Sequence, residues 1–222
     1  MKTDDILKLK KKFNKDGYLH YKSFFNQYEI KTNHKKIIRF CHNIDVPRIL
    51  NPHRKINKIK KLYKNKKLVQ FVENLLGKKI KGLQSELFLN PPGSKGHPPH
   101  QDDFFIKSGV SNSLNTWIPL VNTTVKNGTL KFYKKSNTKF INVKLNNIFL
   151  NEYKKYNLED KFKKKIINCV AGDVIFISNN IFHSSYDNNS RRNRYVVAFG
   201  YIKQGCKFYK GKSANRKLTK VS

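Results

Sequence analysis

The segment HPPHQDDFFIKS, residues 97–108, places two histidines and two aspartates close together in a chain that is otherwise rich in lysine. His100 and Asp102 are two residues apart, so on extended backbone both side chains leave the same face and can bind one ion. The double proline before His100 excludes a helix there, which removes the helical zinc pattern that His97 would otherwise suggest. The segment therefore predicts a pair of metal ligands on a strand.

A second segment, GDVIFISNNIFHSSYDNNSRRNRYVVAFGYI, supplies further groups of this kind. It contains a strand that ends near His183, a polar loop, and a return strand that begins at Arg194. Antiparallel strands joined in this way bring His183 and Arg194 together. Arg194, Val196, Ala198 and Gly200 share one face of mostly small residues, which leaves room for a ligand.

Two imidazoles and one carboxylate form the facial triad that holds non-haem Fe(II) with coordination positions left open. An open site indicates catalysis. A co-substrate that chelates iron through a keto acid needs its distant carboxylate neutralised. A buried arginine offers a bidentate and permanently charged partner for it, and Arg194 has the position for that role.

The elements that must hold these residues form a helical first third and a β-rich remainder. Thr3 caps a first helix that stops at Gly17, GYLHYKSFF follows as a strand, and helical spacing recurs around 34–43 and 58–76. From Lys81 onward the pattern predicts short strands separated by turns, and this spacing indicates a sandwich or barrel. The predicted strands are GLQSELFLN, SLNTWIPLV, GTLKFYK, KFINVKL, KKIINCVA, DVIFIS and RYVVAFGYI.

The composition fits one domain over residues 1–222, with 38% hydrophobic and 13% aromatic residues. Residues 146–165 are predicted as a short helix or insert, and residues 211–222 as a flexible basic tail. The formal net charge of +33 ordinarily indicates nucleic acid or another polyanion as a partner. Because the excess is lysine rather than arginine, we interpret it as a residue bias spread over the surface.

Cysteine use and hydropathy bear on the compartment. Cys41, Cys169 and Cys206 are odd in number and lack C-x-x-C spacing, which indicates neither a disulfide framework nor a zinc site. The N-terminus lacks an apolar signal region, and no apolar run approaches the length of a membrane span. The sequence therefore predicts a soluble, cytoplasmic protein.

These motifs make the chain similar to the phytanoyl-CoA dioxygenase family of Fe(II)- and 2-oxoglutarate-dependent oxygenases. The resemblance covers most of the chain. FNKDGYLHYKSFF resembles the family's opening helix and strand, LFLNPPG the stretch before the metal strand, and HQD the first two iron ligands. TWIPL and NGTLKF resemble the strands that follow, and AGDVIFISNNIFHSS the approach to the last ligand. The resemblance implies a mainly β fold with flanking helices: a double-stranded β-helix (jelly-roll, cupin-like) barrel packed against N-terminal helices.

The resemblance also implies three ligands of Fe(II), which are His100, Asp102 and His183. It implies that Arg194 anchors the C5 carboxylate of the co-substrate 2-oxoglutarate. Ser185 corresponds to a hydroxyl that hydrogen-bonds the same carboxylate, and Trp117 corresponds to a pocket-lining tryptophan. From the residues alone, Ser185 serves equally well as a turn cap, whereas Trp117 is more often simply a core side chain.

Neighbouring candidates have other predicted roles. Asp103 points away from the ligands on a strand, so we assign it a hydrogen-bonding or surface role. His97 is expected beside the site or in solvent, and Asp173 at a structural turn. Arg191 and Arg192 are interpreted as solvated charges that flank the pocket.

Two positions depart from the family pattern. Asn90 stands where relatives often carry lysine before the double proline, which affects one contact with the co-substrate. Lys135, Ser136 and Asn137 replace a Pro-Gly-Ser-His turn in a loop that lies near the pocket mouth in relatives. Substrate specificity is therefore expected to differ from that of familiar members.

The implied reaction consumes O2 and 2-oxoglutarate and hydroxylates a C–H bond of a small-molecule or acyl-thioester substrate, with release of succinate and CO2. Asp102 favours hydroxylation, because related halogenases carry a small residue at the matching position. The lysines fit a phosphorylated or carrier-linked substrate, such as a coenzyme A ester.

Other functions compete with this interpretation. One is a catalytically silent basic β-barrel module that binds nucleic acid or other polyanions. Another is a metal-dependent hydrolase or isomerase, but this function assigns no role to Arg194. A nucleic-acid demethylase is disfavoured, because the arginine pair expected beyond the distal histidine does not occur between Arg194 and Arg216.

Overall fold

The computed structural model describes residues 3–41, 46–138 and 158–221 of the chain. The strands are β1 (Tyr18–Tyr21), β2 (Arg48–Leu50), β3 (Ile80–Phe88), β4 (Ser113–Pro119), β5 (Leu130–Tyr133), β6 (Lys164–Ile167), β7 (Val174–Ser178), β8 (His183–Ser185) and β9 (Val196–Lys203). The helices are α1 (Thr3–Asp16), α2 (Gln27–Cys41), α3 (Asn57–Tyr63), α4 (Lys66–Leu76), α5 (Asp103–Ile106) and α7 (Leu158–Lys161), with short 3-10 helices η1 (Pro52–Arg54) and η2 (Ser136–Thr138).

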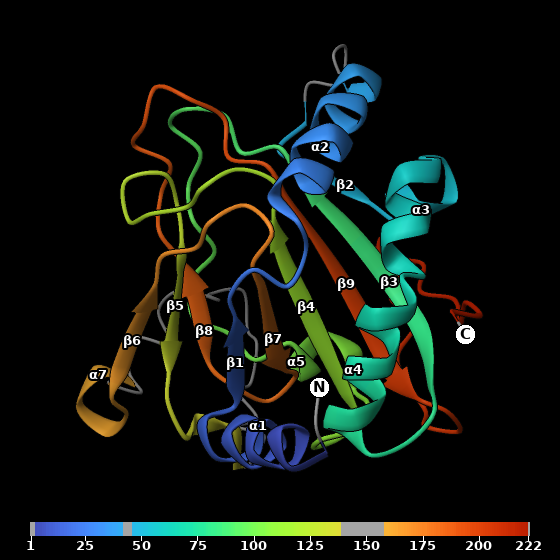
Figure 1. Cartoon of the computed structure of the whole chain (residues 1–222). Helices are drawn as coiled ribbons and strands as arrows, with labels where there is room; N and C mark the ends of the chain where they lie inside the picture. Colours follow the sequence, from blue (N-terminus) through green and yellow to red (C-terminus); the bar gives the residue numbers. More distant parts are fainter. Residues whose placement is uncertain (1–2, 42–45, 139–157, 222) are drawn as a thin grey trace.

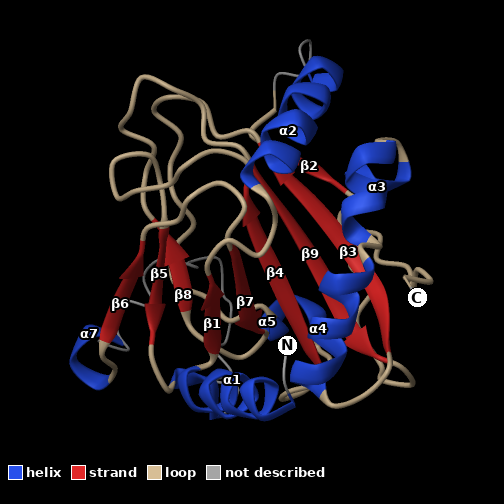
Figure 2. Cartoon of the chain, viewed as in Figure 1, coloured by secondary structure: helices blue, strands red, loops and turns tan. Residues whose placement is uncertain are grey.

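The strands form two antiparallel sheets with helices on the outside (Figures 1 and 2). The larger sheet has the strand order β1-β7-β4-β9-β3-β2, and the smaller sheet has the order β6-β5-β8. Helices α3 and α4 lie along the larger sheet near β3 and β9 (Figure 1). The predicted mainly β fold with flanking helices is thus confirmed.

The described strands form two separate sheets, as a double-stranded β-helix requires, and the chain passes from one sheet to the other after β7. DVIFIS forms β7 in the larger sheet, and the turn that follows carries the chain to β8 in the smaller one. The predicted strands at GLQSELFLN, SLNTWIPLV, GTLKFYK, KKIINCVA and RYVVAFGYI correspond to β3, β4, β5, β6 and β9. KFINVKL lies outside the described residues, as does most of 146–165, where α7 occupies the described end.

The helices follow local signals. α1 ends where predicted, because Gly17 adopts a φ of 79° and its N–H donates to the carbonyl of Phe13 at 2.8 Å. The helix predicted over 58–76 is divided in two, because the Asn65 side chain accepts from the Leu68 N–H at 3.1 Å and starts α4. Within the described parts of the chain, no helix is long and apolar enough to cross a bilayer.

The two larger hydrophobic clusters of the described residues share the central strands, which are buried on both faces. In β7, Val174 and Phe176 pack in the hydrophobic cluster that includes the helices, whereas Ile175 and Ile177 pack in the cluster that includes the smaller sheet. This alternation follows from the two-residue period of a strand. The larger sheet therefore separates the helices from the space that faces the smaller sheet.

Residues 211–221 do not form the flexible tail that the sequence predicts. Thr219 pairs with Gly82 of β3 through hydrogen bonds of 2.9 and 2.8 Å between their backbones, and Val221 belongs to the main hydrophobic cluster. The side chain of Arg216 is also buried. The prediction was wrong because it relied on the basic composition of the segment, whereas Arg216 and Val221 pack inward.

Replacement of Val221 by alanine is expected to lower the free energy of unfolding by about 1–2 kcal/mol, because two buried methyl groups are lost from the core. Val221 is 6% exposed, whereas Leu218 on the same segment is 53% exposed. Leu218→Ala is therefore the matched control, with an expected change within ~0.5 kcal/mol. Urea unfolding followed by circular dichroism measures both values, and equal effects would contradict the packed position of the segment.

The pH dependence of stability is expected to carry a contribution from His53 of η1. Burial, with a smaller effect from the Arg54 charge, lowers the pKa of His53 to about 4, against about 6.5 in the unfolded chain. The unfolded state therefore takes up a proton between these values while the folded state stays neutral. The contribution of His53 to the free energy of unfolding is complete above pH 6.5. It decreases toward pH 4, by at most ~1.4 kcal/mol per pH unit.

His53→Gln is expected to flatten the fall in unfolding free energy between pH 6.5 and pH 4.5, measured by urea titration at several pH values. Lys55→Gln removes an exposed charge two residues away and should leave the slope unchanged. A slope that is the same in the His53 variant and the wild type would mean that other groups account for it.

Candidate active site

A pocket of about 440 Å³ lies between the two sheets and is lined by residues from both. Its polar residues are Arg48, Gln84, Glu86, His97, His100, Asp102, Asn115, Thr116, His183, Ser184, Ser185, Arg194, Ser213 and Arg216. Apolar side chains, among them Phe88, Phe105, Trp117 and Ile177, complete the wall. The pocket therefore contains every residue that the sequence nominates as a ligand or anchor.

The two histidines meet because their backbones are paired directly. His100 and His183 form an antiparallel bridge with two N–H to carbonyl hydrogen bonds of 3.0 Å each. Directly opposed residues of an antiparallel pair point to the same face. The two imidazole rings accordingly lie with their centroids 4.3 Å apart.

Backbone carbonyls determine which ring nitrogen of each histidine faces the pocket. The Nδ1 of His100 lies 2.8 Å from the carbonyl oxygen of Pro98, and the Nδ1 of His183 lies 3.1 Å from that of Ile181. A carbonyl accepts only, so each Nδ1 is the protonated donor and each Nε2 keeps its lone pair when the ring is neutral. Histidine ligands of metals are commonly oriented in this way.

Asp102 reaches the same point by a route that the sequence did not predict. It is not on a strand: its φ of -62° and ψ of -30° are helical, and it immediately precedes α5. Its Oδ1 lies 3.5 Å from Nε2 of His100 and 3.9 Å from Nε2 of His183, while its Oδ2 accepts from Asn115 Nδ2 at 2.7 Å. The predicted convergence of His100 and Asp102 is present, but the strand geometry offered for it was wrong.

The charges of the three groups are coupled. Burial acts to raise the pKa of Asp102, but the neighbouring His183 charge and the hydrogen bond from His100 outweigh it, so this pKa is well below its usual range. Burial acts to lower the pKa of His100, yet the contact with Asp102 raises it. Burial and the His100 charge lower the pKa of His183 to about 4. Asp102 is therefore an anion at neutral pH, whereas the imidazole of His183 is neutral.

Asp103 has the hydrogen-bonding role that was predicted, in a buried position. Its Oδ1 accepts from the backbone N–H of Ser108 at 2.7 Å and from Asn179 Nδ2 at 2.9 Å, and its Oδ2 accepts from the N–H of Gly109 at 3.1 Å. These bonds fix the loop that follows α5. Asp103 thus supports the turn on which Asp102 stands.

Arg194 lies in the pocket wall just before β9, with its side chain 3% exposed. It does not face His183 across a hairpin as predicted, because β8 and β9 belong to different sheets. Its Nη2 donates to Asn90 Oδ1 at 2.6 Å and its Nη1 to the carbonyl of Gly128. The buried Nε has no hydrogen-bond partner.

No carboxylate of the described residues lies within ion-pair distance of Arg194, so its charge is not neutralised by a side chain. Burial lowers the pKa of Arg194 to about 10, which still leaves it charged at neutral pH. The rings of Trp117 and Phe88 lie 5.9 and 6.0 Å from the guanidinium carbon. A buried cation without an anion indicates a place for an anionic ligand.

Ser185 and Trp117 also line the pocket. The Oγ of Ser185 accepts from the His97 N–H at 2.8 Å, which leaves its own hydroxyl proton available as a donor. Trp117 is buried in the cluster between the sheets. His97 lines the rim of the pocket beside His100, with 6.0 Å between the ring centroids.

Several pocket residues were missed because no local motif marks them. Asn115 holds Asp102, and Gly200 allows it to do so, since a Cβ at Gly200 would lie 2.8 Å from Asn115 Oδ1. Asn90, noted only as a departure from the family, holds Arg194. Polar residues at alternate positions of a strand were a usable signal for Gln84 and Glu86 of β3, whereas nothing in the sequence pointed to Arg216.

The remaining candidates lie elsewhere. Arg191 and Arg192 are exposed on their loop, as predicted. Asp173 is at a turn, where it accepts from the N–H of Val170 at 3.0 Å and lies 2.8 Å from His20 Nε2. Cys169 stands near these two, but burial raises the pKa of its thiol to about 12. The thiol of Cys169 is therefore protonated at neutral pH.

The cluster of His100, Asp102 and His183 fits a divalent metal ion. Ligand atoms of His100, Asp102 and His183 all lie within 4.8 Å of one another. Two imidazole nitrogens and one carboxylate oxygen on one side of an ion leave other positions open, which is the donor set of non-haem iron oxygenases.

The chain resembles solved structures over nearly its whole length. The epimerase SnoN in complex with Fe3+, alpha ketoglutarate and nogalamycin RO is 16% identical, with a TM-score of 0.80 over 100% of this chain and 88% of that chain. The carbocyclase SnoK from nogalamycin biosynthesis is 13% identical, with a TM-score of 0.80 over 96% of both chains. EctD from S. alaskensis with 2-oxoglutarate and 5-hydroxyectoine is 17% identical, with a TM-score of 0.74 over 94% of this chain and 78% of that chain.

At these identities the solved structures establish the shared fold. A comparison of the sequence with the curated proteins finds no match. The family model of phytanoyl-CoA dioxygenase, however, matches residues 13–196, which include the whole His-Asp-His cluster and Arg194. The chain therefore belongs to the phytanoyl-CoA dioxygenase family of Fe(II)- and 2-oxoglutarate-dependent oxygenases.

Proposed function

We propose that His100, Asp102 and His183 hold Fe(II), that Arg194 and Ser185 bind the distal carboxylate of 2-oxoglutarate, and that the enzyme hydroxylates a C–H bond of a small-molecule or acyl-thioester substrate. The observation that supports this most directly is the combination in one pocket of the ligand cluster with a buried, unneutralised Arg194. A metal-dependent hydrolase needs the first feature only.

When bound, iron supplies the redox chemistry in which O2 and 2-oxoglutarate oxidise the substrate, with succinate and CO2 as the other products. The chain's own residues prepare the site. The carbonyls of Pro98 and Ile181 keep both Nε2 lone pairs directed at the metal position. Asn115 keeps Asp102 oriented and hydrogen-bonded, so that its anionic oxygen is available at the same position.

The co-substrate is positioned by charge and by exclusion of water. Arg194 offers a fixed guanidinium on a wall with Trp117 and Phe88, where its attraction for a carboxylate is screened less than in water. The Ser185 hydroxyl is a second donor at the pocket wall. Trp117 is proposed to pack against the co-substrate as well as in the core.

Hydroxylation is the proposed outcome because Asp102 is a carboxylate and leaves no ligand position for a halide. Proteins with this fold include those named an epimerase and a carbocyclase, so product analysis has to distinguish the outcomes. A hydroxylated product gains one oxygen atom in mass, whereas an epimerised product gains none.

The test is anaerobic addition of Fe(II) and 2-oxoglutarate to the purified protein. A visible charge-transfer band is expected, followed on exposure to air by succinate formation that candidate substrates accelerate. A protein that stays colourless and forms no succinate would contradict the proposal. It would favour the catalytically silent basic module if binding to a polyanion were strongly salt-dependent.

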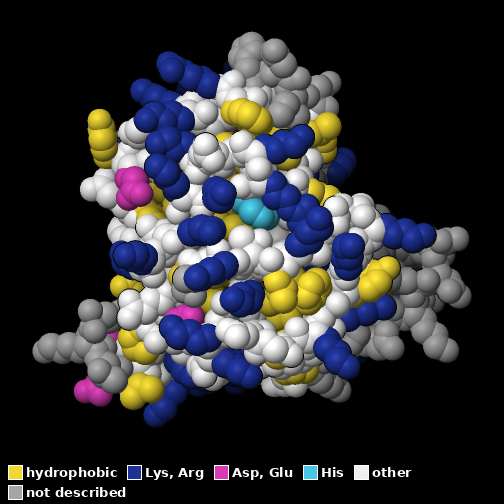
Figure 3. Space-filling view, turned by 90° about the vertical axis from the view of Figure 1, so that its right-hand side faces the viewer, with side chains coloured by type: hydrophobic (Ala, Val, Ile, Leu, Met, Phe, Trp, Pro, Cys, Tyr) yellow, Lys and Arg dark blue, Asp and Glu magenta, His cyan; other side chains and the backbone are white. Residues whose placement is uncertain are grey.

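The surface charge supports the oxygenase over the basic module. On the face shown in Figure 3, lysine and arginine side chains are spread among neutral ones over much of the surface. A dedicated nucleic-acid site usually concentrates its basic residues on one stripe or groove. The net charge of +33 is therefore interpreted as a property of the whole surface.

A further inference from the structure

A second buried arginine, Arg216, lines the same pocket and has no role in the chemistry described above. It is 7% exposed and comes from the C-terminal segment, beyond the residues 13–196 that match the family model. The segment is anchored on both sides of Arg216, since Asn51 Nδ2 donates to the carbonyl of Ala214 at 2.7 Å and Thr219 pairs with Gly82. The position of Arg216 is thus fixed by the fold.

The partners of Arg216 are all neutral oxygen atoms. Its Nε donates to Gln84 Oε1 at 2.6 Å, and its Nη1 donates to the carbonyls of Phe105 at 3.1 Å and Tyr209 at 3.0 Å. Among the described residues, no acceptor is bonded to its Nη2, and no carboxylate lies within ion-pair distance of it. One end of the guanidinium therefore remains available.

Glu86, the acidic residue of β3, already has partners for both of its carboxylate oxygens. Glu86 Oε1 accepts from Gln84 Nε2 at 2.8 Å, and Glu86 Oε2 lies 3.3 Å from Nη1 of Arg48. Glu86 thus neutralises Arg48, which stands at the exposed rim. Glu86 and Asp102 are near enough to act electrostatically on Arg216, but neither described carboxylate forms an ion pair with it. A buried guanidinium without a direct anionic partner favours an anionic ligand.

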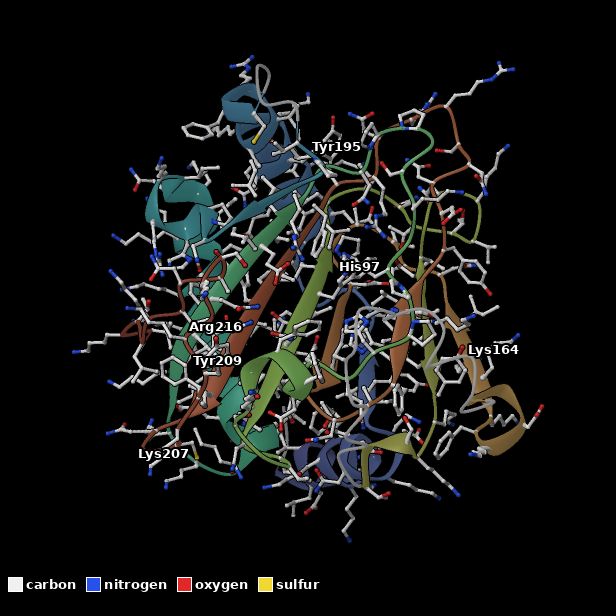
Figure 4. All side chains as sticks on the ribbon, turned by 180° about the vertical axis from the view of Figure 1, so that it is seen from behind. His97, Lys164, Tyr195, Lys207, Tyr209 and Arg216 are labelled. Atoms are coloured by element: carbon white, nitrogen blue, oxygen red, sulfur yellow. The ribbon has the colours of Figure 1, made fainter. Side chains whose placement is uncertain are left out.

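This charge is separate from the one assigned to the co-substrate. Arg194 is held by Asn90 and Gly128, whereas Arg216 is held by Gln84 and by carbonyls near α5 and the C-terminal segment. In the view of Figure 4, Arg216 and Tyr209 lie together near β9 and apart from His97. Two buried guanidinium groups line one pocket, and neither forms an ion pair with a described carboxylate, which indicates two sites for anionic ligands.

We propose that Arg216 binds a carboxylate group of the primary substrate and so selects small carboxylic acids, an inference that rests on the proposed oxygenase function. The free Nη2 of Arg216 presents two N–H donors. A carboxylate accepts such hydrogen bonds and supplies one negative charge next to the guanidinium. The pocket of about 440 Å³ must also hold 2-oxoglutarate, which favours a small substrate. Arg216 would hold this substrate at a distance from the metal cluster and determine which C–H bond is presented.

The test measures binding by calorimetry on protein loaded with nickel(II) and saturated with 2-oxoglutarate, with hexanoate and hexanamide as probes. Wild-type protein is expected to bind hexanoate at least tenfold more tightly than hexanamide. Arg216→Gln should abolish this preference, and Arg216→Lys, which keeps the charge but loses the paired donors, should retain part of it. Lys217→Gln removes an exposed charge from the adjacent residue and should leave the preference unchanged.

Equal binding of the two probes by wild-type protein, or a preference that survives in Arg216→Gln, would overturn the proposal. The wild-type comparison decides the matter even if the Arg216 variants fold poorly. Titration of 2-oxoglutarate alone reports the proposed function separately. A protein that binds 2-oxoglutarate but does not distinguish hexanoate from hexanamide loses only the carboxylate subsite.

Discussion

Arg194→Gln is expected to weaken binding of 2-oxoglutarate by about 100-fold or more, because loss of one member of a buried charge pair costs on the order of 2–5 kcal/mol. Arg194 is buried and has neutral partners only, so its charge is free to act on the co-substrate. Calorimetric titration of the metal-loaded protein with 2-oxoglutarate measures the effect. Arg194→Lys should also bind weakly, since a lysine lacks the forked donors.

The matched control is Arg191→Gln, which removes an equal charge from an exposed position three residues away. It is expected to leave the Kd for 2-oxoglutarate within about twofold, because exposed charges are screened by solvent. Thermal melting of both variants identifies any loss of fold. A folded Arg194→Gln protein with wild-type affinity would show that another residue anchors the co-substrate.

Asp102→Asn is expected to reduce the affinity for Fe(II) by about 100- to 1000-fold and to abolish succinate formation. The substitution keeps the shape of the side chain but removes the only negative charge of the cluster, and such a loss from a buried charge pair costs ~3–5 kcal/mol. Trp117 is the single tryptophan of the chain and lines the pocket, so its fluorescence is a direct probe of metal titration.

His97→Gln is the control for Asp102→Asn, since His97 lines the pocket but lies outside the cluster of ligand atoms. It is expected to keep the affinity for Fe(II) within about threefold. The reverse pattern, with metal binding lost in His97→Gln and kept in Asp102→Asn, would mean that a different set of residues binds the metal.

The candidate site was largely predictable from two short segments. His100, Asp102 and His183 carry side chains whose chemistry suits iron, and the spacing of Arg194 from His183 matched a family pattern. The geometric reasons were less secure. His100 and His183 meet through a direct backbone pairing between residues far apart in the chain, and Asp102 turns inward because helix α5 begins there.

The sequence by itself determined the secondary structure of most of the chain and the identity of the groups able to bind iron, because periodicity and side-chain chemistry are properties of short windows. Only the tertiary structure decided that β7 and β8 belong to different sheets, that Val221 and Arg216 of a basic segment are buried, and that Glu86 already neutralises Arg48. These features depend on which distant surfaces are buried against each other. The free energy of that burial is shared over the whole core and leaves no mark in any single stretch of residues.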